Sequence, residues 1–104
     1  MDTIKKIDGY LNEARKMSPK VKKDLVGTAL QIVFEYPNWG QEHVSDMFDA
    51  IDRPKFEFED LEDITIAADK LKKKGFGWGE VEDFLMKQKG TPAEIWKKVH
   101  KVTR

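Results

Sequence analysis

Residues 24–41 read DLVGTALQIVFEYPNWGQ, and this stretch decides the fold of the chain. Its segment from Leu25 to Phe34 is apolar almost all round, which is typical of a helix buried on several sides. Ser18 and Pro19 precede it as an N-cap and a first helical residue. Pro37 ends it, because proline disfavours a helical conformation in the residue before it. We therefore predict a buried central helix over about residues 19–35.

Similar signals predict helices on both sides of this one, because apolar residues recur at three- and four-residue spacing. Further helices are predicted over about residues 2–16, 39–51, 60–74 and 78–89, and a last one begins at the capping box TPAE (91–94). Asp60 is the predicted N-cap of the fourth helix, and KFEFE (55–59) is a candidate short extended segment. The sequence thus predicts an all-α fold, a compact bundle of five to six short helices in one domain over residues 1–104.

A second feature is that YPNWGQ (36–41) recurs in altered form as GFGWGE (75–80). Residues 24–41 can be laid on 63–80 without gaps, which indicates either an internal duplication or two helices begun by similar caps. We predict Asn38 and Gly77 as N-caps, with each tryptophan as the first helical residue and Gln41 and Glu80 reaching back to the cap. Each indole would then cover the end of the preceding helix, whereas exposed indoles on a shared face would be binding candidates.

Charge is distributed unevenly, although the formal net charge is zero. Residues 1–30 carry a net charge of +3, residues 31–70 carry −8 and residues 71–104 carry +5. The alternatives are that basic and acidic helices pack beside one another, or that their faces bind charged partners.

Several classes of function are not expected. The chain has no cysteine, which excludes disulfides and thiol chemistry. The beginning of the sequence has no signal-peptide pattern, and no stretch is apolar enough for a membrane span, so we expect a cytoplasmic, intracellular protein. His43 and His100 lack ligand-spaced companions. His43, Ser45 and Asp46 cannot form a catalytic relay by themselves, because residues two apart on a helix point to different faces. We predict no enzyme activity, no metal, no cofactor and no small-molecule substrate.

The sequence EFEDLEDITIAAD (57–69) is the predicted protein-binding face, because it places six carboxylates over thirteen positions. Such a surface can imitate the phosphates of a nucleic acid and occupy a basic groove, or it can be an ordinary solvated face. The predicted acidic residues are Glu57, Glu59, Asp60, Glu62, Asp63 and Asp69. The function predicted from them is non-enzymatic binding to a protein, as an adaptor, an assembly factor or an inhibitor.

The alternative is nucleic-acid binding through residues 80–104, which read as helix, turn and basic helix and so resemble a helix-turn-helix. Against it stand Glu94 at the start of the second helix and a pI of about 6.7. The basic residues that would bind a nucleic acid or an acidic partner are Lys72, Lys73, Lys74, Lys87, Lys89, Lys97, Lys98, Lys101 and Arg104.

Overall fold

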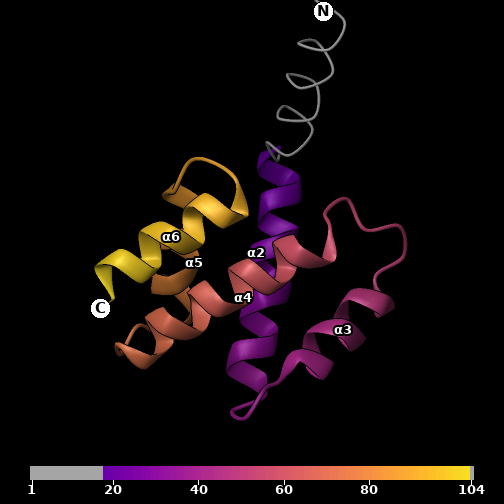
Figure 1. Ribbon diagram of the computed structural model, residues 1–104, viewed down its shortest axis with the longest axis horizontal. Helices are drawn as coiled ribbons and strands as arrows, with labels where there is room; N and C mark the ends of the chain where they lie inside the picture. The colour runs from indigo at the N-terminus through magenta and orange to yellow at the C-terminus, as the bar shows by residue number, and fades with distance from the viewer. Residues whose placement is uncertain (1–17, 104) are drawn as a thin grey trace, which may run out of the picture.

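The computed structural model describes residues 18–103, and within them the chain forms helices and no strands (Figure 1). The helices are α2 (Pro19–Glu35), α3 (Gln41–Ala50), α4 (Phe58–Lys73), α5 (Trp78–Lys87) and α6 (Pro92–Val102). The predicted all-α fold is confirmed. The predicted helix over residues 2–16 and the basic residue Arg104 lie outside the described residues.

Local capping explains where the helices begin. Ser18 Oγ accepts a hydrogen bond from the Val21 N–H at 3.3 Å, and α2 begins at Pro19 as predicted. The prediction of Asp60 as an N-cap is wrong, because the N-cap lies three residues earlier in the chain. Glu57 is the N-cap of α4, and Asp60 reaches back to accept the Glu57 N–H at 3.0 Å. As a result α4 begins within the segment that was predicted to be extended.

The prediction that α2 is the buried central helix is not confirmed. Helix α4 packs against α2, α3, α5 and α6, whereas α2 packs against α3, α4 and α5. In Figure 1, α4 crosses in front of α2, with α3 on one side and α6 on the other. The outer face of α2 carries exposed polar residues, namely Lys20, Lys23, Asp24, Gln31 and Glu35.

The core lies where α2 and α4 cross. Leu30, Val33 and Leu61 are fully buried there, and Val81, Leu85, Ile95 and Val99 join them from α5 and α6. Thr65 is a buried polar residue whose Oγ1 donates to the Leu61 carbonyl at 2.6 Å, so its polar group has a partner.

Two helix pairs repeat one plan. Helices α2 and α3 have 17 and 10 residues, and α4 and α5 have 16 and 10. Residues that the alignment of 24–41 on 63–80 equates are buried in both long helices, as at Leu25 and Ile64 or Ala29 and Ala68. Helix α6 stands outside this plan and packs on α4. Within residues 18–103, no helix combines the length and the apolar character needed to cross a membrane.

Candidate protein-binding surface

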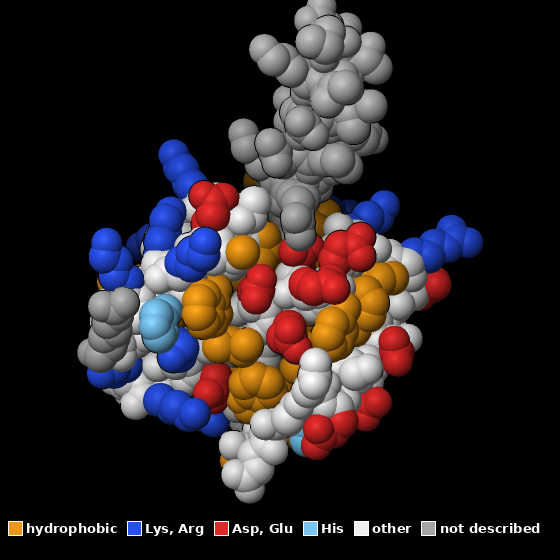
Figure 2. All heavy atoms as spheres, in the orientation of Figure 1, with side chains coloured by type: hydrophobic (Ala, Val, Ile, Leu, Met, Phe, Trp, Pro, Cys, Tyr) orange, Lys and Arg blue, Asp and Glu red, His pale blue; other side chains and the backbone are white. Residues whose placement is uncertain are grey.

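Five carboxylates lie on the outward faces of α3 and α4. On α3 they are spaced by four and three residues, which places them on one side of the helix. Helices α3 and α4 pack together, and Gln41 Nε2 donates to Glu62 Oε2 at 3.0 Å across their junction. Figure 2 shows acidic side chains spread over the part of the molecule where these helices lie. We call this set the acidic α3–α4 surface: Glu42, Asp46, Asp49, Glu59 and Glu62.

The structure divides the six predicted acidic residues into two groups. Glu57 and Glu59 are exposed, and Glu62 and Asp63 are half-buried. The other two stabilise the fold: Asp60 is 7% exposed and holds the start of α4, while Asp69 has internal partners. These partners are the Trp39 indole N–H, at 3.2 Å from Asp69 Oδ1, and the Lys73 ammonium, at 2.9 Å from Oδ2. The segment 57–69 therefore offers fewer free carboxylates than its composition indicates.

Helix α3 supplies acidic residues that the sequence prediction missed. Glu42, Asp46 and Asp49 are all exposed. Their signal was present in the net charge of −8 over residues 31–70 and in their spacing opposite Val44 and Phe48. The prediction considered only the densest run of carboxylates, and helix packing places a second, sparser row beside it.

An apolar residue interrupts the charges on the outer face of α4. Ile66 is half-buried and lies one turn after Glu62. One turn further along the same face comes Lys70, followed by Lys73, so the face changes from acidic to basic along the helix. An apolar position bordered by charged groups is a common arrangement in protein interfaces.

The predicted basic residues are also divided. Lys72 is drawn inward, since its Nζ donates to the Val33 carbonyl at 3.0 Å and lies 5.3 Å from the centre of the Phe34 ring. Lys73 pairs with Asp69, and Lys98 Nζ donates to the Lys89 carbonyl at 3.0 Å. The remaining predicted lysines are exposed: Lys74, Lys87, Lys89, Lys97 and Lys101. In Figure 2 most of the basic side chains lie on the α6 side of the face, and a smaller group lies at the upper right, next to acidic side chains.

Helices α5 and α6 do not form a closely packed pair. Helix α5 packs mainly on α2, and α6 packs on α4. Their connection is held by Lys22 of α2, whose Nζ donates to the carbonyls of Met86, at 3.0 Å, and Gln88. Burial, and secondarily the nearby Lys98, lowers the pKa of Lys22. A helix-turn-helix instead places its two helices as one unit on DNA.

The first corner, residues 36–41, differs from the prediction. Gly40, and not Asn38, is the N-cap of α3, and His43 rather than Gln41 reaches back, with Nδ1 accepting the Gly40 N–H at 2.8 Å. Trp39 therefore precedes the helix. Its ring is half-buried against the core, and its N–H is bound to Asp69 of α4.

The second corner, residues 75–80, follows the prediction in its backbone. Gly77 is the N-cap of α5, Trp78 is the first helical residue, and Glu80 Oε1 accepts the Gly77 N–H at 3.1 Å. The indole, however, remains 41% exposed, and its ring centre lies 5.5 Å from that of Phe34. Tyr36, in the first corner, is likewise 40% exposed. At the second corner, the Trp78 ring is therefore partly packed on the protein and partly an exposed aromatic surface.

Trp96 and His100 form a stacked pair on α6, with ring centres 5.2 Å apart and an angle of 5° between the planes. Trp96 Nε1 and His100 Nδ1 are buried without a hydrogen-bond partner among the described residues. His43 likewise has a structural role, since it caps α3 and packs 4.9 Å from the Tyr36 ring centre. Over residues 18–103, no group of three or more His, Asp or Glu residues is arranged to hold a metal ion.

Comparison with known proteins gives no relative: no protein-family model, no curated protein and no solved structure matches the chain.

Proposed function

We propose that the protein is a non-enzymatic binding protein that recognises a basic protein through the acidic α3–α4 surface. One observation carries the proposal. Five carboxylates lie on the outward faces of two adjacent helices, while most basic side chains in Figure 2 lie toward α6 at the other end of the same face. A surface of one sign attracts a partner of the opposite sign and orients it on approach. Ile66, among these charges, would give the partner an apolar contact.

The role of such a protein would be that of an adaptor, an assembly factor or an inhibitor. An inhibitor would occupy the basic groove of its target in place of a nucleic acid. We propose a cytoplasmic setting, in keeping with a chain that has no cysteine.

Nucleic-acid binding is the weaker alternative. Three of its predicted lysines have partners within the chain, since Lys72 binds a carbonyl of α2, Lys73 binds Asp69 and Lys98 binds the Lys89 carbonyl. The separate packing of α5 and α6 also gives little support to a recognition helix held by its neighbour. What favours this alternative is the exposed face of α6, with Lys97 and Lys101.

The test is affinity capture from an extract of the native host, with and without nuclease, using three forms of the full chain. The first is the unmodified protein. The second neutralises the acidic surface with Glu42→Gln, Asp46→Asn, Asp49→Asn, Glu59→Gln and Glu62→Gln. The third is a matched control that neutralises five lysines with Lys74→Gln, Lys87→Gln, Lys89→Gln, Lys97→Gln and Lys101→Gln.

We expect mass spectrometry to identify a basic protein that the unmodified chain and the lysine variant retain and the acidic variant loses, whether or not nuclease is present. Loss from the lysine variant alone, together with loss on nuclease treatment, would instead assign the binding to nucleic acid. Circular dichroism on each form checks that the substitutions leave the helices intact.

A further inference from the structure

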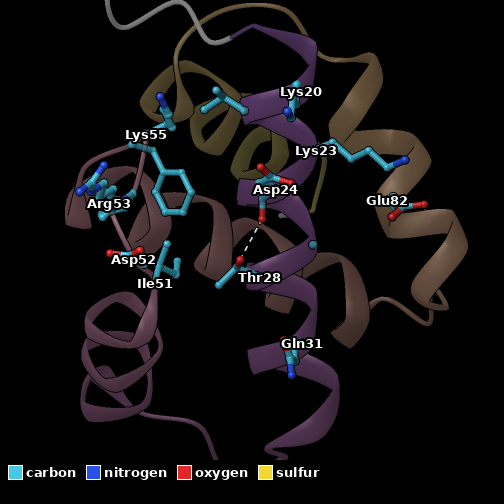
Figure 3. A pocket seen from close by; sticks show the side chains of 14 residues that line it. Lys20, Lys23, Asp24, Thr28, Gln31, Ile51, Asp52, Arg53, Lys55 and Glu82 are labelled. Atoms are coloured by element: carbon cyan, nitrogen blue, oxygen red, sulfur yellow. Dashed lines mark hydrogen bonds between the residues drawn. The ribbon is translucent and has the colours of Figure 1, made fainter.

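A groove runs along the outer face of α2. It has a volume of about 830 Å³ and lies between the loop over residues 51–56 and Glu82 of α5 (Figure 3). Its side chains carry charges of both signs, as Figure 3 shows for Lys55 and Asp52. A charged ligand of either sign would meet a like charge there, so the charges of this groove select no ligand.

A second cavity, of about 480 Å³, lies where the start of α2 meets the connection between α5 and α6. Figure 1 shows this connection beside the first turns of α2. Leu25 of α2, Ile64 of α4 and Ile95 of α6 line the cavity, and each is only 1% exposed. The half-buried Met86 of α5 adds an unbranched side chain that can adapt to a ligand. A cavity of this size with largely apolar walls is typical of a small-molecule site.

The charges around this second cavity have one sign. Its charged lining residues are Lys22, Lys87 and Lys89, and over the part of the chain that the structure describes no Asp or Glu lines it. Glu94 of α6 follows the wall in sequence, but its carboxylate accepts the Thr91 N–H at 3.1 Å and does not line the cavity. Apolar walls with only positive charges favour a ligand that combines an aliphatic part with an anionic group.

Lys22 is the lysine whose ammonium the fold holds in place. Its Nζ donates to the carbonyls of Met86, at 3.0 Å, and Gln88; both residues line the cavity, so the ammonium lies at the cavity wall. An ammonium has three N–H donors, and the third has no acceptor among the described residues. Burial, and secondarily the nearby Lys98, lowers the pKa of Lys22. A bound anion would favour the charged ammonium and so offset both effects.

We propose that this cavity binds a medium-chain aliphatic carboxylate, with the carboxylate on Lys22 and the aliphatic chain against Leu25, Ile64 and Ile95. The carboxylate receives a charge-assisted hydrogen bond, and the chain is removed from water. The exposed Lys87 and Lys89 add to the positive potential that attracts the anion. Such a ligand was not predicted from the sequence, because the lining residues come from four different helices.

Calorimetric titration of the full chain with octanoate tests the binding. The test variant is Lys22→Met, which removes the charge and keeps most of the length of the side chain. The matched control is Lys72→Met, because Lys72 likewise donates to a carbonyl near a helix end, that of Val33, but does not line the cavity. Circular dichroism on both variants checks that the helices remain intact.

We expect the unmodified protein to bind one octanoate per chain and Lys22→Met to bind it at least about tenfold more weakly, because a hydrogen bond between charged groups is lost. Lys72→Met should bind octanoate as the unmodified protein does. Equal affinity in Lys22→Met and the unmodified protein would overturn the proposal.

A second measurement uses only the unmodified protein and decides the question if Lys22→Met fails to fold. Octylammonium and butanoate should each bind at least about tenfold more weakly than octanoate, because the first carries the wrong charge and the second buries less apolar surface. In NMR spectra, octanoate should shift the amide signals of residues 86–90.

Three results of this second measurement would contradict the proposal: no binding of octanoate, equal binding of octylammonium, or amide shifts confined to the groove of Figure 3. None of these results depends on the acidic α3–α4 surface, so this inference and the proposed function fail separately.

Discussion

The two Trp-Gly corners begin from nearly the same sequence signal and reach different environments. Trp39 is half-buried and its N–H is held by Asp69, whereas Trp78 rests on Phe34 and leaves 41% of its surface exposed. Each indole packs on the long helix of the other pair, so its burial depends on what that helix presents. A local motif can set where a helix starts, but the neighbouring helix decides whether the tryptophan is a core residue or a surface residue.

The largest expected effect separates the two tryptophans by stability. Trp39→Ala should lower the free energy of unfolding by about 3 kcal/mol, because it removes core packing and leaves Asp69 without one of its partners. Trp78→Ala should cost about 1 kcal/mol, because much of its ring already contacts water. Urea denaturation of both variants measures the difference. Equal losses would show that the exposed indole contributes as much to the free energy of unfolding as the half-buried one.

Asp69 provides the next test, since it binds both Trp39 and Lys73. Asp69→Ala should lower the free energy of unfolding by about 1–2 kcal/mol, because it leaves the indole N–H unsatisfied. Lys73→Ala removes only the exposed ion pair and should cost about 0.5 kcal/mol or less. The same urea experiment gives both values, and a larger loss for Lys73→Ala would assign the stabilising role to the ion pair.

The glycines of the second corner should respond in opposite directions. Gly75 has φ of 99°, so Gly75→Ala should lower the free energy of unfolding by about 1 kcal/mol. Gly77 has an extended backbone and room for a Cβ, so Gly77→Ser should raise it by about 0.3 kcal/mol through a capping oxygen. Thermal melts of the two variants compare the signs. A destabilising Gly77→Ser would contradict the assignment of Gly77 as the N-cap.

The capping box of α6 gives the smallest effect and depends on pH. Hydrogen bonds from Thr91, first from its backbone and then from its side chain, lower the pKa of Glu94 in the folded protein. A lowered folded-state pKa means that Glu94 contributes stability above its ordinary value near 4.5, and that this contribution is lost as the pH falls through the folded pKa. The free energy of unfolding of Glu94→Gln should therefore be lower than that of the unmodified protein at pH 7. The gap between the two values should diminish as the pH is lowered. A difference independent of pH would mean that the carboxylate charge has no part in the cap.

These contrasts also indicate what the sequence could predict. The ends of α2 and the starts of α5 and α6 were predicted well, because Pro19, Gly77 and the box at Thr91 act through residues close in sequence. The choice of central helix could not be made this way, because the neighbours of α4 come from all parts of the described chain.

The candidate site shows the same division. The acidic run on α4 was visible in the sequence, but its internal use by Asp60 and Asp69 depends on a backbone turn and on a residue of another helix. The contribution of α3 requires knowing that α3 packs beside α4. Local composition therefore located the acidic region, while helix packing selected the residues that face outward.

The most direct measurement is the affinity of the captured basic partner for the purified full chain, determined by calorimetry at several salt concentrations. We predict that binding to the unmodified protein weakens as salt is raised, since salt screens exposed charges. We predict that the variant with five neutralised carboxylates on α3 and α4 binds at least about tenfold more weakly and depends less on salt, and that the lysine variant binds as the unmodified protein does. Unchanged affinity in the carboxylate variant would contradict the assignment of the acidic α3–α4 surface as the binding site.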